Sequence, residues 1–326
     1  MEYRKLPGTG LKLSILSLGT MQFGGQTSEA DSLAIMDFAF ENGINVFDTA
    51  NAYTGGESEK IVGKGIKGRR DKIILATKAG NRVGEDINCI GLGRRHLISA
   101  LDASLKRLDT DYVDIYYMHT PDYDTPLEES LETMSGFVKS GKVRYVGISN
   151  YASWQVADIF AVCDKNGYTA PVITQNVYNL ITRGVEAELI PCIEAHDLGM
   201  TVYNPIAAGI LAGKHSPGTP AQDTRFADVH SQSQAYYSRY WTDENFDAVE
   251  KLKKIAADCG MSILQFAMKW CALRQIVTSI IIGVSRMSQI EQNISLLDGA
   301  ELDAQSLAQC DEIWRSLSGT RFAYNR

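Results

Sequence analysis

Eight short runs rich in aliphatic and β-branched residues alternate with amphipathic helical patterns along most of this 326-residue chain. Such alternation predicts βαβ units, which place their strands in a parallel sheet. Because nothing interrupts the alternation, we expect the sheet to close into an α/β fold, the (β/α)8 TIM barrel, with an open doubly wound sheet as the alternative. The predicted strands are residues 15–19, 45–48, 73–78, 113–119, 143–149, 173–175, 201–204 and 279–283.

The helical patterns have the spacing of one buried face. In the pattern over residues 94–108, leucines recur every three or four residues, as packing against a sheet requires. The length suits one barrel of roughly 250 residues or more, and we find no low-complexity linker. We therefore predict a single domain over residues 1–326. The predicted helices include residues 29–42, 94–108, 127–140, 153–165 and 185–197.

Two segments fall outside the repeat. The opening, with Pro7-Gly8-Thr9-Gly10 between short apolar pieces, predicts a β-hairpin that plugs the barrel floor. A long polar loop, residues 213–243, follows the seventh strand and ends in a cluster of aromatic residues at 236–241. Loops of this length are functional lids or are disordered, and the aromatic cluster favours a lid.

Composition excludes several classes of function. The net charge of -7 and the pI near 5.3 argue against a nucleic-acid surface, which needs clustered lysine and arginine. The charged start and the lack of a run of ~18 apolar residues predict neither a signal peptide nor a membrane span, so we expect a cytoplasmic protein. The six scattered cysteines predict reduced thiols, and their spacing suggests no metal site.

Ionisable residues stand at the ends of three predicted strands. Asp48 ends the second strand, Lys78 the third and His119 the fourth, and Tyr53 follows Asp48 by five residues. In a parallel barrel, strand ends meet at one mouth, where active sites are built. We therefore expect these four side chains to converge.

The four side chains together form a proton-donor system. A tyrosine phenol can protonate a carbonyl oxygen, but its pKa of about 10 makes it a weak acid. A lysine ammonium ~4 Å away favours the phenolate by roughly 4 kcal/mol, or ~3 pKa units, as an upper bound. Asp48 would balance the charge of Lys78, and His119 would polarise the carbonyl. Carbonyl reduction also needs a hydride, which implies a nicotinamide cofactor.

Plainer explanations exist for each residue alone. Asp48 could cap a helix, Tyr53 could be an ordinary aromatic residue, and His119 could be structural. Their joint placement at strand ends favours catalysis. By contrast, residues 63–68 match G-x-G-x-x-G but follow a helical pattern, whereas a dinucleotide fingerprint follows a strand. We predict a helix end there and no cofactor site.

Ordered sequence blocks resemble the aldo-keto reductase family, in its bacterial-type branch. The resemblance runs nearly end to end and implies a (β/α)8 barrel that reduces carbonyls with NADP(H). It also implies that Asp48, Tyr53, Lys78 and His119 are the catalytic tetrad. The blocks are the Asp-Thr-Ala-x-x-x-Tyr run from Asp48, then 101–109, 112–114, 141–150, 175–179, 203–205, 209–214, 281–286 and 289–293.

The same resemblance implies a cofactor-binding set. Its members would hold the nicotinamide carboxamide (Ser149, Asn150, Gln175), stack on the ring (Tyr203), enclose the pyrophosphate (Gly209, Leu211, Gly213, Lys214), bind the 2′-phosphate (Arg286) and meet the adenine (Gln289, Asn293). The full set is Gly19, Thr20, Met21, Asp48, Ser149, Asn150, Gln175, Tyr203, Asn204, Pro205, Ile206, Gly209, Leu211, Gly213, Lys214, Gly283, Ser285, Arg286, Gln289, Gln292 and Asn293.

Cofactor preference depends on the last block. The best-known family members carry a lysine where Gly283 stands and an arginine where Gln289 stands, and Arg286 would compensate. A guanidinium suits a phosphate dianion, and residues 284–289 hold no acidic side chain for a free ribose hydroxyl. We therefore expect NADP(H), with NAD(H) as the alternative.

The sequence leaves substrate and partners open. We expect a small carbonyl or sugar-like substrate, no nucleic acid or membrane partner, and leave a homo-oligomer open. Two rival functions remain: a sugar dehydrogenase working in the oxidative direction, and a nucleotide-sensing binding protein like the potassium-channel β-subunits that resemble this family. Candidate substrate-facing residues are Met21, Phe23, Asn51, Arg82, Asp122, Tyr123 and Tyr151.

Overall fold

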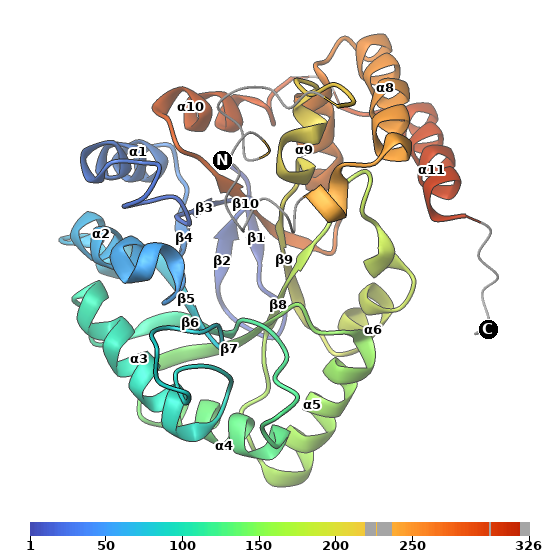
Figure 1. Ribbon diagram of the computed structural model, residues 1–326. Helices are drawn as coiled ribbons and strands as arrows, with labels where there is room; N and C mark the ends of the chain where they lie inside the picture. The colour runs from blue at the N-terminus through green and yellow to red at the C-terminus, as the bar shows by residue number, and fades with distance from the viewer. Residues whose placement is uncertain (219–225, 227–236, 300, 320–326) are drawn as a thin grey trace. The chain divides into compact units, whose positions relative to one another are not determined.

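The computed structural model describes residues 1–218, 226, 237–299 and 301–319. Within them, parallel strands form one closed barrel in the order β10-β3-β4-β5-β6-β7-β8-β9, which confirms the predicted (β/α)8 TIM barrel (Figure 1). The predicted strand bounds hold to within a few residues. The barrel strands are β3 (Leu16–Gly19), β4 (Val46–Asp48), β5 (Ile74–Ala79), β6 (Val113–Met118), β7 (Val143–Ser149), β8 (Ile173–Val177), β9 (Gly199–Tyr203) and β10 (Val277–Gly283).

Helices connect successive strands, and Figure 1 shows α1 to α5 on the outside of the barrel. The leucines of α3 are buried along one face, as their spacing predicts. The helices around the barrel are α1 (Glu29–Glu41), α2 (Glu57–Ile66), α3 (Arg94–Leu108), α4 (Leu127–Lys139), α5 (Ser153–Asn166), α6 (Leu189–Ala195) and α10 (Met287–Ser295), with the short 3-10 turns η1 (Tyr53–Gly56), η2 (Arg70–Lys72) and η3 (Gly184–Glu186).

Of two helical segments, one contradicts its sequence prediction and the other agrees with it. The helix predicted over 185–197 is wrong in its first half, because η3 comes first and α6 begins only at Leu189. Pro191 explains this: proline is tolerated in the first turn of a helix but breaks a helix interior. The helix end predicted at residues 63–68 is confirmed, because α2 ends at Ile66, with Gly63 and Gly65 in its last turn. A side chain at Gly63 would meet the Leu108 backbone at 2.7 Å, so the glycine serves helix packing.

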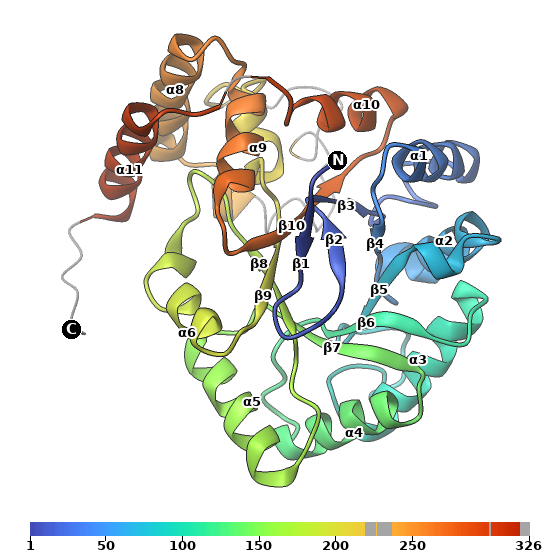
Figure 2. The same ribbon diagram turned by 180° about the vertical axis from the view of Figure 1, so that it is seen from behind.

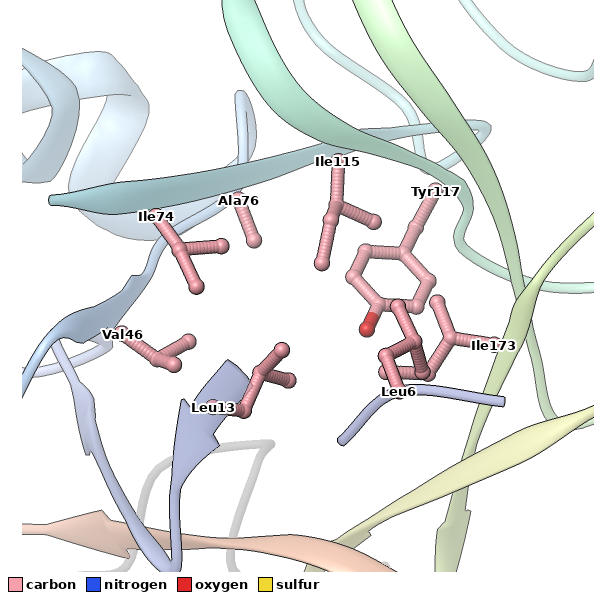
Figure 3. Close-up of a cluster of buried hydrophobic side chains, with 8 residues drawn as sticks. All are labelled: Leu6, Leu13, Val46, Ile74, Ala76, Ile115, Tyr117 and Ile173. Carbon is pink, nitrogen blue, oxygen red and sulfur yellow. The ribbon is translucent and has the colours of Figure 1, made fainter. Parts of the chain in front are cut away.

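The N-terminal hairpin closes one end of the barrel. Strands β1 (Tyr3–Lys5) and β2 (Lys12–Ser14) pair antiparallel, and Figure 2 shows them across the barrel. Leu6 and Leu13 are fully buried among side chains from the barrel strands β4, β5, β6 and β8 (Figure 3). The predicted floor plug is therefore confirmed. The cluster comprises Leu6, Leu13, Val46, Ile74, Ala76, Ile115, Tyr117 and Ile173.

The chain forms two compact units. The first, Met1–Asn176 with Val185–Tyr203 and Gln275–Ile294, holds the hairpin and the barrel. The second comprises Val177–Gly184, Asn204–Arg274 and Ser295–Arg326. Its described elements are the 3-10 turn η4 (Ala207–Ala212), α8 (Asp243–Asp258), α9 (Ile263–Leu273) and α11 (Ala304–Ser318), with α8 packed against both α9 and α11. The single-domain assignment stays a prediction.

Part of the predicted lid, residues 219–225 and 227–236 of the 213–243 segment, lies outside the described residues. The lid function therefore stays a prediction. Among the helices that the structure does describe, we find none with both the length and the hydrophobicity of a membrane span.

Candidate active site

A buried ion pair joins two neighbouring barrel strands. Asp48 ends β4, and its Cα pairs in register with Ala76 of β5, so Lys78 lies two residues further along on the same face. Both side chains are buried, at 4% and 0% exposure, and Lys78 Nζ lies 2.5 Å from Asp48 Oδ1. Burial of two charges is tolerated only with close pairing and further hydrogen bonds. A purely structural contact would gain little stability from this ion pair, because burying both charges has a large desolvation penalty.

The ammonium of Lys78 has three acceptors. Besides Asp48, Nζ donates to the Thr49 carbonyl at 2.8 Å and to Tyr53 Oη at 3.4 Å. Burial alone would lower the pKa of Lys78, but the charge of Asp48 and then the interaction with Tyr53 outweigh it, and the pKa is raised. Lys78 is therefore a permanent cation beside the phenol.

Tyr53 is held by a strained turn. It begins η1, and the next three residues, Thr54, Gly55 and Gly56, have φ of 47°, 65° and 94°. A β-branched residue with positive φ is a genuine outlier, and such strain persists only where the surroundings enforce it. Thr54 Oγ1 donates to the Phe23 carbonyl at 2.7 Å and accepts from Ser58 N at 3.0 Å. These bonds fix the direction in which Tyr53 leaves the turn.

His119 follows β6 and faces Tyr53. The two ring centres are 5.9 Å apart at an interplanar angle of 78°. Burial, and then the charge of Lys78, lower the pKa of His119 to about 3, so the imidazole is neutral. Asn81 Nδ2 lies 3.2 Å from His119 Nδ1. An amide N–H donates, so this orientation makes Nδ1 the acceptor and leaves the proton on Nε2.

A polar network continues from the ion pair to the next strand ends. Gln175 Nε2 donates to Asp48 Oδ2 at 3.0 Å, and Ser149 Oγ donates to the Gln175 carbonyl at 2.9 Å. Asn150 Nδ2 donates to Ser149 Oγ at 3.0 Å, and Tyr203 Oη donates to Asn150 Oδ1 at 2.6 Å. The residues predicted to hold a nicotinamide carboxamide thus lie together beside the predicted tetrad.

The first predicted cofactor block has clear packing roles. A side chain at Gly19 would meet Ile281 Cγ2 at 2.6 Å, so β3 needs glycine to pack beside β10. Thr20 is fully buried, and its hydroxyl bonds the Asp48 carbonyl at 3.0 Å and Ser58 Oγ at 2.8 Å. Thr20 therefore supports the segment that carries Asp48. Cofactor contacts by Gly19, Thr20 and Met21 stay predictions.

The last predicted block forms the start of α10. Gln289 Oε1 accepts from Ser285 N at 2.7 Å, so this side chain caps the helix. Gly283, Arg286 and Gln292 are exposed, which leaves them accessible to a ligand. Contacts of these residues and of Asn293 with the adenosine end stay predictions.

The predicted pyrophosphate block lies in the second unit and has an unusual backbone. Ala207, Ala208 and Gly209 have φ of 49°, 57° and 109°. Consecutive alanines with positive φ cost about 1–2 kcal/mol each, and such strain is typical of ligand-binding segments. Among the described residues, a side chain at Gly209 would have only His215 Nε2 within 4 Å, at 3.6 Å. The other members are the αL residue Asn204, Pro205, Ile206, the fully buried Leu211, Gly213 with φ of 71°, and the exposed Lys214.

The substrate-facing residues stay predictions, and another site residue was missed. Phe23 is fully buried and Tyr151 is 5% exposed. The Asp122 carboxylate accepts a hydrogen bond from Leu92 N at 2.6 Å, so it has a structural role in the loop before α3. Sequence reasoning missed Asn81, the partner of His119, although its place just after β5 was a usable signal.

Comparison with known proteins agrees with this geometry. The family model described as "Aldo/keto reductase family" matches residues 15–315. A protein of Arabidopsis thaliana named "Probable voltage-gated potassium channel subunit beta" is 36% identical over 303 residues, covering 91% of this chain and 92% of the relative.

Two further relatives are named as reductases. "L-glyceraldehyde 3-phosphate reductase" of Escherichia coli (strain K12) is 34% identical over 321 residues, which cover 96% of this chain and 92% of the relative. "Aflatoxin B1 aldehyde reductase member 2" of Rattus norvegicus is 33% identical over 313 residues, which cover 91% and 83%. The similarity therefore extends over the whole barrel.

Proposed function

Since the chain belongs to the aldo/keto reductase family, we propose that it reduces a small aldehyde or ketone with NADPH. The proposal rests above all on one observation, the buried Lys78 ammonium bonded to both Asp48 and Tyr53. That arrangement suits a phenol that gives up its proton, because the nearby cation stabilises the negative charge that develops on Oη.

Tyr53 is the general acid in this proposal. Its oxygen accepts from Lys78, and a hydroxyl that accepts one hydrogen bond keeps its own proton for another partner. Asp48 holds Lys78 in place and keeps it charged. The proton therefore passes from Tyr53 to the carbonyl oxygen of the substrate.

His119 orients the substrate in this proposal. With a pKa lowered to about 3, it carries no spare proton near neutral pH. Its Nε2–H can still donate a hydrogen bond to the carbonyl oxygen, because Asn81 occupies Nδ1. The division of labour between Tyr53 and His119 follows from the two environments.

The cofactor fits the groups around the tetrad. NADPH, when bound, supplies the hydride to the carbonyl carbon. The carboxamides of Asn150 and Gln175 offer both donors and acceptors, which a nicotinamide carboxamide needs. Arg286, in the same unit as the tetrad, supplies an exposed cation for a phosphate group. NADP(H) rather than NAD(H) is therefore the proposed cofactor.

Aldehydes are the proposed substrate class, because two relatives carry aldehyde reductase activities in their names. The test is NADPH oxidation by the purified chain with glyceraldehyde, glyceraldehyde 3-phosphate and an aromatic aldehyde. We expect turnover within the ordinary enzyme range of about 1–10³ s⁻¹ for at least one of them. NADPH binding without turnover of any aldehyde or ketone would contradict the proposal, and NADP⁺ reduction with alcohols or sugars as the faster reaction would favour the oxidative alternative.

A second candidate function comes from relatives named as potassium channel β-subunits. A chain of that kind would bind the nucleotide and report its state to a membrane partner. Fluorescence titration with NADPH, combined with single-turnover reduction of an aldehyde, separates the two functions. Tight binding with turnover far below about 1 s⁻¹ would favour the sensor.

A further inference from the structure

A cavity lies beside the turn that carries Tyr53. It has a volume of about 460 Å³ and is formed wholly within the first unit, between residues 51–55, the loop after β5 and α3 residues from His96 to Arg107. This volume lies in the range of small-molecule sites. Tyr53 itself is not among its walls, so the cavity is distinct from the reacting groups.

Two buried polar side chains on the walls are unpartnered. Asn51 is 3% exposed, and within the described residues neither its Oδ1 nor its Nδ2 has a hydrogen-bond partner. His96 is 5% exposed, and its Nε2 is also unpartnered there. Leaving a buried polar group unbonded costs about 1–3 kcal/mol. A buried polar group of this kind calls for a specific explanation, and a ligand in the cavity would provide the missing bonds.

The charge on the walls is positive. Arg107 is bonded to Glu59 at 2.7 Å, which offsets its charge. Arg82 is exposed, and its Nη1 donates to the Asp86 carbonyl at 3.1 Å. Glu85 and Asp86 lie in the same loop, but among the described residues that line the cavity we find no acidic side chain. The apolar part of the wall is made by Ala52, Val83, Ala100 and Ala103.

We propose that this cavity binds a small organic anion, a carboxylate or a phosphate ester with a short apolar chain. Arg82 pairs with the anionic group, Asn51 and His96 donate hydrogen bonds, and the alanines contact the chain. The molecule is a ligand and is not consumed.

A ligand in the cavity would contact residues on both sides of Tyr53 in the turn. Asn51, Ala52 and Gly55 line the cavity, and they flank Tyr53 on both sides in the sequence. The turn is strained at Thr54 and Gly55. Contacts that favour one arrangement of this turn change the placement of Tyr53, which makes the cavity a site of regulation.

The test is calorimetric titration of the full chain carrying Tyr53→Phe, which separates binding from the proposed catalysis. The probes are butyl phosphate, butyrate and inorganic phosphate. We expect a dissociation constant of about 1 mM or lower for a butyl probe. Butyl phosphate should bind at least ~10 times more tightly than inorganic phosphate, because the apolar wall adds to the charge contact.

Variants assign the binding to the cavity. Arg82→Gln should weaken binding about tenfold or more, as loss of a charge-assisted bond predicts. Arg95→Gln removes the same charge from an α3 residue outside the cavity and should change binding less than about twofold. Arg286→Ala, at the predicted cofactor phosphate site, should also leave it unchanged.

Asn51→Leu provides an independent readout. It should abolish binding and raise the melting temperature of the free chain, because an unpaired buried amide is removed. No saturable heat at about 10 mM probe would overturn the proposal. Equal losses in the Arg82 and Arg95 variants would do the same, as would loss of binding in Arg286→Ala.

Discussion

The two ends of the same barrel strands have opposite chemistry. In β4, Val46 lies at the floor and Asp48 two residues later at the mouth, and in β5, Ile74 lies at the floor and Lys78 at the mouth. All four are almost fully buried. Burial is therefore equal, and only the surroundings differ, with aliphatic neighbours at one end and hydrogen-bonding groups at the other.

This contrast separates stability from chemistry within one element. A buried aliphatic side chain at the floor contributes about 1.5–3 kcal/mol to folding. The attraction between Asp48 and Lys78 at the mouth does little more than offset the free energy of removing both charges from water. The hairpin supplies Leu6 and Leu13 to the floor, so the floor can hold the barrel closed while the mouth keeps its costly charges. Variants at the two ends should accordingly fail in different ways.

The largest expected effect is at the mouth. Tyr53→Phe keeps the ring, whose centre lies 5.0 Å from Lys78 Nζ, but removes the hydroxyl. We expect turnover to fall by about 10²–10⁴ or more, as for a lost general acid, with cofactor affinity close to normal. Steady-state kinetics and NADPH titration measure both quantities. Full activity of this variant would remove Tyr53 from the proposed mechanism.

At the floor, Leu13→Ala should do the reverse. Loss of this fully buried side chain should lower the free energy of unfolding by about 2–5 kcal/mol through the cavity it leaves. Urea unfolding measures the loss, and turnover at low temperature should stay near normal. Leu11→Ala is the matched control, because Leu11 packs against the same cluster but is only partly buried. A specific loss of turnover in Leu13→Ala would break the separation between floor and mouth.

A smaller effect is expected at the rim of the mouth. Arg286 is exposed between the end of β10 and α10, so its removal should leave folding unchanged. Arg286→Ala should weaken NADPH binding by about 10–100-fold and NADH binding much less, as loss of a charge-assisted phosphate contact predicts. Fluorescence titration with both cofactors gives the ratio. Equal losses would place the 2′-phosphate elsewhere.

The contrast between floor and mouth can be predicted from the sequence, because one short pattern specifies both ends of a strand. An apolar run that ends in Asp48, Lys78 or His119 specifies a strand and its mouth residue together. The hairpin was predictable from Pro7 and its neighbours for the same local reason. Features that depend on one strand and the next turn are therefore recovered with little error.

Contacts between distant segments were less predictable. The reason for Gly19 is the approach of Ile281, which no local pattern reveals. The partner of His119 is Asn81, 38 residues earlier, and it decides which ring nitrogen carries the proton. Pro191 was visible in the sequence, but our prediction of a helix over 185–197 did not take it into account. Tertiary neighbours thus fix the details that chemistry depends on.

The smallest expected effect is a titration that does not occur. The folded-state pKa of His119 is about 3, below its ordinary value of about 6.5, so folding favours the neutral ring. Its contribution to stability is complete above about pH 6.5 and is lost as pH falls toward 3. NMR of the folded chain should therefore show no titration of this ring between about pH 8 and pH 4.5, while the urea-unfolded chain titrates near 6.5. His119→Gln should make the acid-side loss of stability shallower. If His119 of the folded chain titrated near pH 6.5, its ring would be as well hydrated as a surface histidine. The contrast with the floor would then rest on Asp48 and Lys78 alone.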